Sequence, residues 1–295
     1  MIFNRNIKEK IIEGALFLRA SVSILTTVSI IAILMYEIVA FFEEVSILDF
    51  LTDTQWTPLF ADKHFGIMAL MSGTILTTFI AIALALPFGL LIAIYLSEYA
   101  SKRTRQWLKP TLELLATVPT VVYGFFALTI VTPFLQNIFP NLAGFNALSP
   151  GLVMGIMIIP LITSLSEDAM YAVPQSLRDG AYALGSSTLQ TAWKVVVPAA
   201  SSGIIVSVLL AVSRAIGETM IVAIAAGQQP RLTLNPMVPI ETVTTYIVQV
   251  SMGDVPHGSL EYKTIFAAGF SLFVFTFILN NISFYIKKKY LQQYE

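Results

Sequence analysis

Six long apolar segments dominate the sequence, and they restrict the fold more than any other feature. A helix needs about 20 apolar residues to cross a hydrocarbon core about 30 Å thick. With 56% hydrophobic and 12% charged residues, the composition also suits a membrane protein better than a soluble domain. We therefore predict an all-α, polytopic membrane protein with six transmembrane helices. The six segments lie near 20–42, 69–97, 111–135, 150–172, 199–226 and 264–286.

The distribution of Lys and Arg predicts the orientation of these helices. The first segment begins too far along the chain, and runs too long, for a cleaved signal peptide, so we expect it to remain as an anchor. Thirteen basic residues fall on one side, three fall on the other, and Arg214 lies inside the fifth segment. Because basic residues collect in cytoplasmic loops, we place both termini and 174–198 in the cytoplasm. The thirteen are Arg5, Lys8, Lys10, Arg19, Lys102, Arg103, Arg105, Lys109, Arg178, Lys194, Lys287, Lys288 and Lys289, and the three are Lys63, Arg231 and Lys263.

The composition argues against several kinds of site. The chain has no Cys and only two His, His64 and His257, in loops far apart in the sequence. Neither a disulfide framework nor a metal site is therefore expected. The basic residues form no stripe interleaved with aromatic residues, so nothing supports nucleic-acid binding. A G-x-x-x-x-G-K-[ST] loop is also absent, and the chain is not expected to bind ATP itself.

The polar stretch 174–198 separates two apolar segments and predicts a helical hairpin. Gly185 suits the left-handed position that ends a helix. Ser187 and Gln190 have the spacing of a capping box, which predicts a second helix just after Ser187. Pro198 should break or kink the backbone before the next apolar run. The hairpin is either a docking element or an ordinary membrane loop. Its first helix would follow Pro174 and carry an apolar stripe formed by Leu177, Ala181 and Leu184.

The two long segments on the opposite side differ in character. Residues 43–66 are acidic and predict a solvated loop. Residues 227–262 are rich in Pro and Gly, but Ile240, Val243 and Ile247 recur at helical spacing. This pattern predicts a short helix that lies at the interface or dips between the spans, with a plain loop as the alternative.

Small residues and prolines mark close packing and breaks in the spans. Pro87 and Pro119 interrupt the second and third segments, and such breaks persist in lipid only where other groups satisfy the freed carbonyls. Thr120 and Tyr123, with Thr117, place polar groups beside the second break. These polar residues are interpreted either as the lining of a substrate path or as part of a structural kink. The small residues that predict helix packing are Gly151, Gly155, Gly203, Ser207, Ala211 and Ala215.

Arg214 and Glu218 place two charges near the middle of the fifth segment. Four residues apart on one helix, they would share a face and could form a salt bridge that only holds the bundle together. Intramembrane ionisable residues are costly, however, and usually mark a transport path. A guanidinium suits a phosphate or carboxylate, and a neighbouring acid could hold the Arg in the empty site and favour a protonated oxyanion over sulfate. We count Thr219, Thr120 and Tyr123 with this pair as candidate substrate-path residues.

The stretch DGAYALGSSTLQTAWKVVVP at 179–198 resembles the cytoplasmic "EAA" loop of ABC importer permeases. That loop reads EAA, three residues, Gly, nine residues and I-x-L-P. The spacing agrees throughout, while Asp replaces Glu, Gly replaces the first Ala, and Val replaces Ile and Leu. The matching positions are Asp179, Gly180 and Ala181 for EAA, Gly185 for Gly, and Val195, Val197 and Pro198 for the end.

Three further stretches, 65–101, 118–128 and 213–227, look like the permeases of phosphate-specific importers. The GETM at 217–220 is more similar to the PstC-type permease than to its PstA-type partner. The resemblance covers 65–290 and implies a type I ABC importer permease fold with cytoplasmic termini. It divides the chain into 1–64, with the first helix and an external loop, and a transmembrane domain that carries the coupling loop 174–198.

The resemblance also implies partners. The hairpin would dock on separate PstB-like ATPase subunits, which would bind ATP and Mg. A PstA-like permease would complete the path through the membrane of a bacterium or archaeon, and an extracytoplasmic PstS-like phosphate-binding protein would dock on the outer loops. The alternatives are a permease for molybdate or sulfate, the PstA-type partner itself, and a channel or carrier that works without an ATPase.

Overall fold

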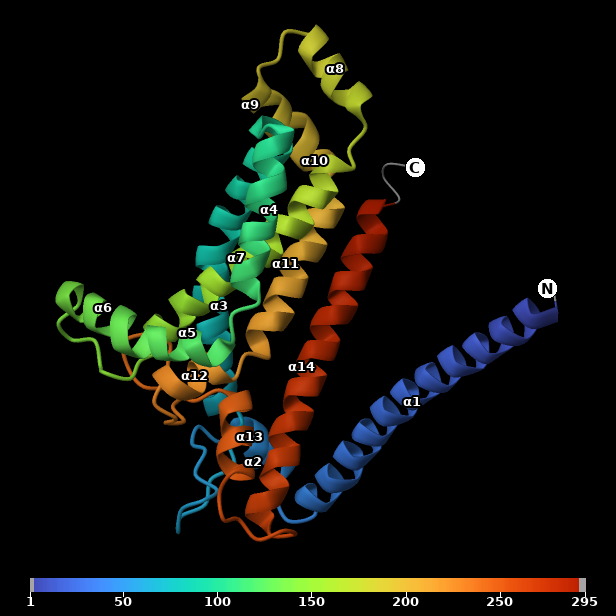
Figure 1. The fold of residues 1–295 in the computed structure, drawn as a ribbon. Helices are drawn as coiled ribbons and strands as arrows, with labels where there is room; N and C mark the ends of the chain where they lie inside the picture. Colours follow the sequence, from blue (N-terminus) through green and yellow to red (C-terminus); the bar gives the residue numbers. More distant parts are fainter. Residues whose placement is uncertain (1–2, 292–295) are drawn as a thin grey trace.

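The computed structural model describes residues 3–291, and this part of the chain forms helices without a strand (Figure 1). Side chains are described for 9–282 and 284–285, so Arg5, Lys8 and 287–289 lie outside the described side chains. The helices are α1 (Phe3–Phe42), α2 (Ile47–Thr52), α3 (Met68–Ile94), α4 (Lys102–Ala116), α5 (Thr120–Phe126), α6 (Thr132–Ile138), α7 (Leu148–Tyr171), α8 (Gln175–Ala183), α9 (Thr188–Thr191), α10 (Val197–Ala199), α11 (Ser201–Ile216), α12 (Met220–Ala225), α13 (Val243–Ser251) and α14 (Leu260–Leu291), with π-helical turns η1 (Tyr95–Tyr99), η2 (Ala127–Val131) and η3 (Ala192–Val196).

Five continuous helices in the described chain are long and apolar enough to cross a membrane. A sixth crossing results if the segments Thr188–Ala199 and Ser201–Ile216, which are bent by 73°, count as one span. The predicted first, second, fourth and sixth spans are confirmed. The five continuous helices are Glu9–Phe42, Met68–Tyr99, Thr120–Ile138, Leu148–Tyr171 and Leu260–Ile282.

The third span differs from the predicted 111–135. The chain first forms the separate amphipathic helix α4, breaks at 117–119, and starts the apolar span at Thr120. Pro119 causes the break because it lacks an N–H and disfavours helical backbone at the preceding residue. Pro87 has no such effect, and α3 continues through it, contrary to the interruption that we predicted.

The fifth span also differs from the predicted 199–226. Helix α11 ends at Ile216, with Gly217 as its C-cap, and the chain resumes as α12 after two more residues. Glycine weakens a helix interior by roughly 0.5–1 kcal/mol relative to alanine, which favours a helix end at this position. The charged residues of this segment therefore lie at a break between two helices rather than on one continuous helix.

Close packing of α3, α7 and α11 forms the centre of the bundle. A Cβ atom added at Gly155 would lie 2.8 Å from the Ala81 carbonyl oxygen on α3, so only glycine permits this approach. A Cβ at Gly203 on α11 would likewise collide with Ala169 on α7. The small residues in these spans are confirmed as packing positions.

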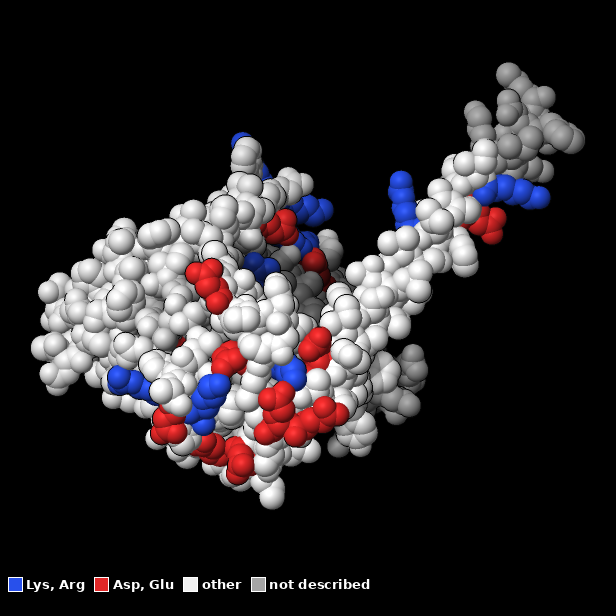
Figure 2. All heavy atoms as spheres, turned by 90° about the horizontal axis from the view of Figure 1, so that it is seen from below, with Lys and Arg blue, Asp and Glu red and all other residues white. Residues whose placement is uncertain are grey.

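The two ends of the bundle carry opposite charge. The basic end comprises residues 100–110 and 172–200, where α8 and α9 project beyond the spans (Figure 1). The acidic end comprises 43–67 and 226–263, and acidic side chains gather there (Figure 2). At this end α1, α2, α13 and α14 share a core that includes Phe41, Trp56 and Tyr246, whereas the rest of α1 leans away from the bundle.

Candidate functional site

Arg214 is an exposed cation in the last turn of α11. Its Nη2 lies 4.0 Å from Sδ of Met157 on α7, and a thioether sulfur is only a weak acceptor. Among the described residues, Arg214 forms no ion pair. A guanidinium exposed on a membrane-spanning helix is too costly to face lipid. A polar path or a partner subunit must therefore cover this face.

Glu218 is buried in the break between α11 and α12. Its Oε1 accepts a hydrogen bond from the Ile221 N–H (3.3 Å) at the start of α12. Negative charge is favoured at a helix N-terminus, where backbone N–H groups lack partners. The backbone carbonyl of Glu218 accepts a separate hydrogen bond from Thr244 Oγ1 (2.9 Å), so α13 also holds this break in place.

The predicted pairing of Arg214 with Glu218 is therefore wrong for this chain. The two residues would be one turn apart on a continuous helix, but Gly217 ends α11 between them. The carboxylate is instead occupied by the N-terminus of α12. In the single chain the acid does not hold the arginine, and the guanidinium remains available to another anion.

The break in the third span packs against the same region, because α5 lies on α12 (Figure 1). A Cβ added at Gly124 would lie 2.8 Å from Ile224 Cδ1, which shows how closely the helices approach. Tyr123 Oη donates to the Leu115 carbonyl (2.8 Å) at the end of α4. Tyr123 thus donates to the carbonyl whose helical i+4 partner, Pro119, has no N–H. This contact is the structural role that the sequence offered as the alternative to a substrate path. Thr120 is half-buried at the start of α5, and Thr219 Oγ1 donates to the Gly217 carbonyl (3.3 Å).

The hairpin at the basic end folds as its sequence predicts. Pro174 is the N-cap of α8, and Gly185 has φ +82°, the left-handed conformation expected at the turn. Ser187 and Gln190 form both bonds of the capping box before α9. Beyond η3 and α10, which contains Pro198, the chain bends by 73° into α11.

The tip of the hairpin exposes apolar side chains to solvent. Leu184 is 89% exposed, and Asp179 and Gly180 are exposed with it, while Ala181 packs inward. A group of exposed apolar residues on a projecting element is typical of a protein interface. The other large apolar residues exposed here are Leu177, Tyr182, Leu189 and Trp193.

Arg178 anchors this hairpin, and the sequence did not single it out as a site. Its Nε donates to Glu98 Oε2 (3.1 Å) and its Nη2 donates to Glu98 Oε1 (2.9 Å), across the gap between α8 and η1. The same guanidinium donates to the carbonyls of Val173 (2.6 Å) and Met170 (2.9 Å). One buried side chain thus ties the hairpin to the ends of two spans. The available sequence signal was an acidic residue, Glu98, directly after the apolar segment 69–97.

A second buried anchor holds α4 to α7. The side chain of Glu167 is fully buried and forms ion pairs with Arg105 (2.5 Å) and Lys109 (2.8 Å) of α4. Lys109 also pairs with Asp168 (2.5 Å), and the Arg105 guanidinium lies 3.8 Å above the Tyr171 ring. The basic face of α4 is therefore largely used within the chain.

A bundle of apolar helices long enough to cross a membrane, with a cation at a break between α11 and α12 and an anchored hairpin projecting at one end, has the architecture of a membrane permease subunit. A family model described as "Binding-protein-dependent transport system inner membrane component" matches residues 85–293. The chain belongs to this family. It is a multi-pass membrane protein and a subunit of a binding-protein-dependent transport system.

Relatives cover most of the chain. It is 37% identical over 234 residues to a probable ABC transporter permease protein, YqgH, of Bacillus subtilis, covering 79% of this chain and 75% of the relative. It is 34% identical over 256 residues to the phosphate transport system permease protein PstC of Mesorhizobium japonicum, covering 80% and 77%.

Solved structures agree on the fold. A bacterial alginate ABC transporter, in complex with an alginate-bound periplasmic protein, aligns with TM-score 0.58 at 16% identity, covering 90% of this chain and 92% of that chain. An inward-facing MetNI methionine ABC transporter aligns with TM-score 0.55 at 15% identity, covering 76% and 94%. The predicted type I importer permease fold is confirmed.

Proposed function

We propose that this chain is the PstC-type permease subunit of an ATP-driven importer of inorganic phosphate. Relatives at 30–37% identity support the proposal, because several of them are named phosphate transport permeases. The observation that carries it is Arg214, a guanidinium in a broken membrane span without a carboxylate partner among the described residues. Such a group offers an anion a rigid fork of donors.

In this proposal, phosphate passes Arg214 along a path between this chain and a PstA-like second permease. The exposed face of α11 around Arg214 would border the path. Glu218 would act on the position of α12 through its bond to the Ile221 N–H, rather than as a direct partner of the arginine. Thr219 and Thr120, at the two breaks, would supply further polar groups. Their hydroxyl groups both donate and accept hydrogen bonds, as a phosphate oxygen or its proton requires.

The hairpin would couple the path to ATP hydrolysis by two PstB-like ATPase subunits, which bind ATP and Mg. Its exposed apolar tip around Leu184 would enter a groove of the ATPase. The anchor between Arg178 and Glu98 would transmit the movement to α3 and α7. A PstS-like phosphate-binding protein would dock on the acidic end, which the charge distribution places outside the cell.

Assembly and transport together test this proposal. The chain is co-expressed with its candidate ATPase and second permease and purified in detergent. The complex is then placed in liposomes with the phosphate-binding protein outside and ATP inside. We expect the subunits to co-purify and phosphate uptake to require ATP. Purification of the chain without any ATPase, or uptake that does not depend on ATP, would contradict the proposal and favour a carrier.

Two substitutions distinguish a role in phosphate binding from a purely structural role. Replacing Arg214 by Lys keeps the charge but removes the bidentate fork, so we expect phosphate uptake to fall. Replacing Glu218 by Gln keeps an acceptor for the Ile221 N–H, so we expect a smaller change. Normal transport by both variants would exclude these residues from the path.

A further inference from the structure

A small cavity opens at the acidic end, away from the Arg214 region. Its volume is about 280 Å³, just below the roughly 300–1,000 Å³ of pockets that hold drug-sized ligands. The lining comes from three parts of the chain, which are the loop after α2, the loop between α12 and α13, and α13 itself. The lining residues that matter here are Trp56, Phe60, Gln228, Glu241, Tyr246 and Gln249.

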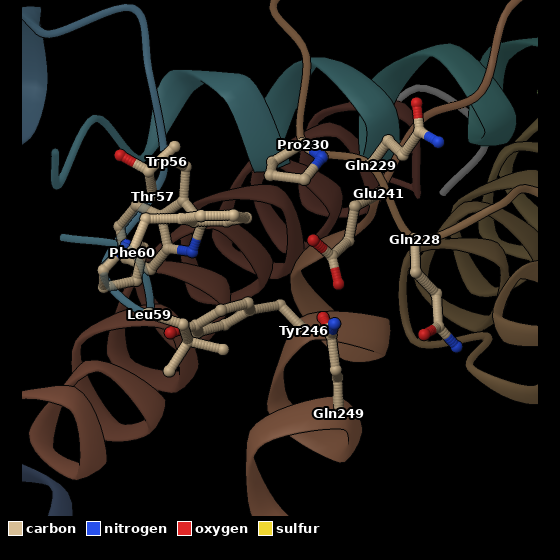
Figure 3. A pocket seen from close by; sticks show the side chains of 11 residues that line it. Trp56, Thr57, Leu59, Phe60, Gln228, Gln229, Pro230, Glu241, Tyr246 and Gln249 are labelled. Atoms are coloured by element: carbon tan, nitrogen blue, oxygen red, sulfur yellow. The ribbon is translucent and has the colours of Figure 1, made fainter. Parts of the chain in front are cut away.

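The cavity contains a buried carboxyl group without a partner. Glu241 is only 2% exposed, and its Oε1 has no hydrogen-bond partner among the described residues. Figure 3 shows this carboxyl pointing into the space between Trp56, Tyr246 and Gln249. Leaving a buried acid unpaired is costly, and burial raises the pKa of Glu241 to about 8. Without a partner, this carboxyl therefore favours its neutral, protonated form, and an entering cation would displace the proton and supply the missing partner.

The walls favour an organic cation over a metal ion. The rings of Trp56 and Tyr246 meet edge to face at 5.0 Å, and Thr264 fixes the tyrosine hydroxyl at 2.6 Å. Aromatic faces attract ammonium and guanidinium groups. Mg²⁺ or Ca²⁺ would require about six oxygen ligands, whereas most of this wall is aromatic or aliphatic carbon. A carbon chain that ends in a cation matches both the walls and the carboxyl.

Basic residues of this chain do not fill the cavity. Among the described residues, its lining contains neither Lys nor Arg. Lys63 and Lys263, the nearby lysines of the acidic end, pair with Glu261 (2.5 Å) and Glu44 (2.6 Å). Arg231 donates to Gln229 (3.0 Å) at the rim. The cation must therefore come from outside the chain.

The surrounding surface indicates the source of that cation. The acidic end carries eight acidic residues, of which Glu241 is buried, and three basic ones, so its surface attracts a basic partner (Figure 2). We propose that the cavity receives a lysine or arginine side chain of the extracytoplasmic protein that delivers the substrate. This inference rests on the proposed function, and it specifies where and by what chemistry that protein docks. The eight acidic residues are Glu43, Glu44, Asp49, Asp53, Asp62, Glu241, Asp254 and Glu261, and the three basic ones are Lys63, Arg231 and Lys263.

Docking affinity of the assembled complex tests this inference. The complex is placed in lipid nanodiscs, and a fluorescently labelled binding protein is titrated against it. We expect Glu241→Gln to weaken docking at least tenfold, because the amide cannot pair with a cation. Asp62→Asn is the matched control, since Asp62 is a 97% exposed acid of the same end, and we expect a change of less than twofold.

A second variant places a cation of this chain in the cavity. Gln249 is exposed at the rim, so Gln249→Lys supplies an ammonium group that competes with the partner. We expect docking to fall at least tenfold, with thermal stability unchanged or raised. If Glu241→Gln and Gln249→Lys bound the binding protein with the same affinity as the Asp62→Asn control, the inference would be overturned. The proposed function would remain intact. An assembled wild-type complex that binds no binding protein would instead refute the proposed function, and this inference with it.

Discussion

Replacing Arg178 by Gln should loosen the hairpin at 174–198 from the spans. The substitution removes a guanidinium that donates to both oxygens of Glu98 and to two carbonyls at the end of α7. Breaking a buried ion pair by removing one partner costs about 3–5 kcal/mol, because the other charge is left uncompensated. The Glu98 side chain is only 3% exposed, so we expect a cost within this range.

Two measurements follow from this cost. Thermal unfolding in detergent should occur at a lower temperature for Arg178→Gln than for the wild type. In liposomes, ATP hydrolysis should continue while phosphate uptake per ATP falls, because the hairpin no longer moves rigidly with α3 and α7. Arg103→Gln is the matched control, since Arg103 is an exposed arginine of the same end and its loss should change neither quantity.

A double substitution separates the charge from the contact. Arg178→Met with Glu98→Leu removes both charges, so no buried charge is left unpaired. We expect this variant to recover part of the lost stability but not the coupling, because the bonds to the carbonyls of Met170 and Val173 are also gone. Wild-type stability and coupling in Arg178→Gln would refute the reasoning.

Three further predictions concern other parts of the chain. Leu184→Asp should weaken binding of the ATPase by about 10- to 100-fold, since burying a leucine contributes about 1.5–3 kcal/mol, without changing thermal unfolding of the isolated chain. Pull-down titration measures this, and unchanged binding would exclude the tip as the docking surface. Gly203→Ala should lower the unfolding temperature through its collision with Ala169, whereas Gly14→Ala, which meets no neighbour within 4 Å, should not. Glu241→Gln should stabilise the protein at pH 9 but hardly at pH 4, as thermal unfolding would show. The unfolded chain releases this proton above about pH 4.5 and the folded chain only near pH 8, so the wild type loses at most about 5 kcal/mol as pH rises between these values. The same pH dependence of thermal unfolding in the variant and the wild type would contradict the burial of a protonated Glu241 carboxyl.

Local sequence rules predicted the parts of the fold that depend on neighbouring residues. The turn at Gly185, the capping box of Ser187 and the helix around Val243 all appear in the structure. Each depends on backbone geometry or spacing within a few residues. The packing role of the glycines at 155 and 203 was equally predictable, because small residues in a membrane span usually mark the close approach of a neighbouring helix.

The charged site was harder to predict because tertiary contacts decide it. Spacing alone placed Arg214 and Glu218 on one face, but Gly217 ended the helix and the start of α12 took the carboxylate. Continuity of the helix was the assumption that failed. The partners of Arg178 and Glu167 lie 80 and 58 residues away in the sequence, so only the fold brings them together.

Phosphate uptake by the Arg214→Gln complex tests the central claim most directly. The variant and Arg19→Gln, an exposed arginine of α1 as control, are assembled with the ATPase and second permease and compared in liposomes with the binding protein. A lost charge-assisted hydrogen bond contributes about 1.5–3 kcal/mol, so we predict uptake reduced about 10- to 100-fold. Assembly and ATP hydrolysis should persist in the same preparation. Wild-type uptake by Arg214→Gln, or failure of the complex to assemble, would contradict the claim that this arginine meets the anion.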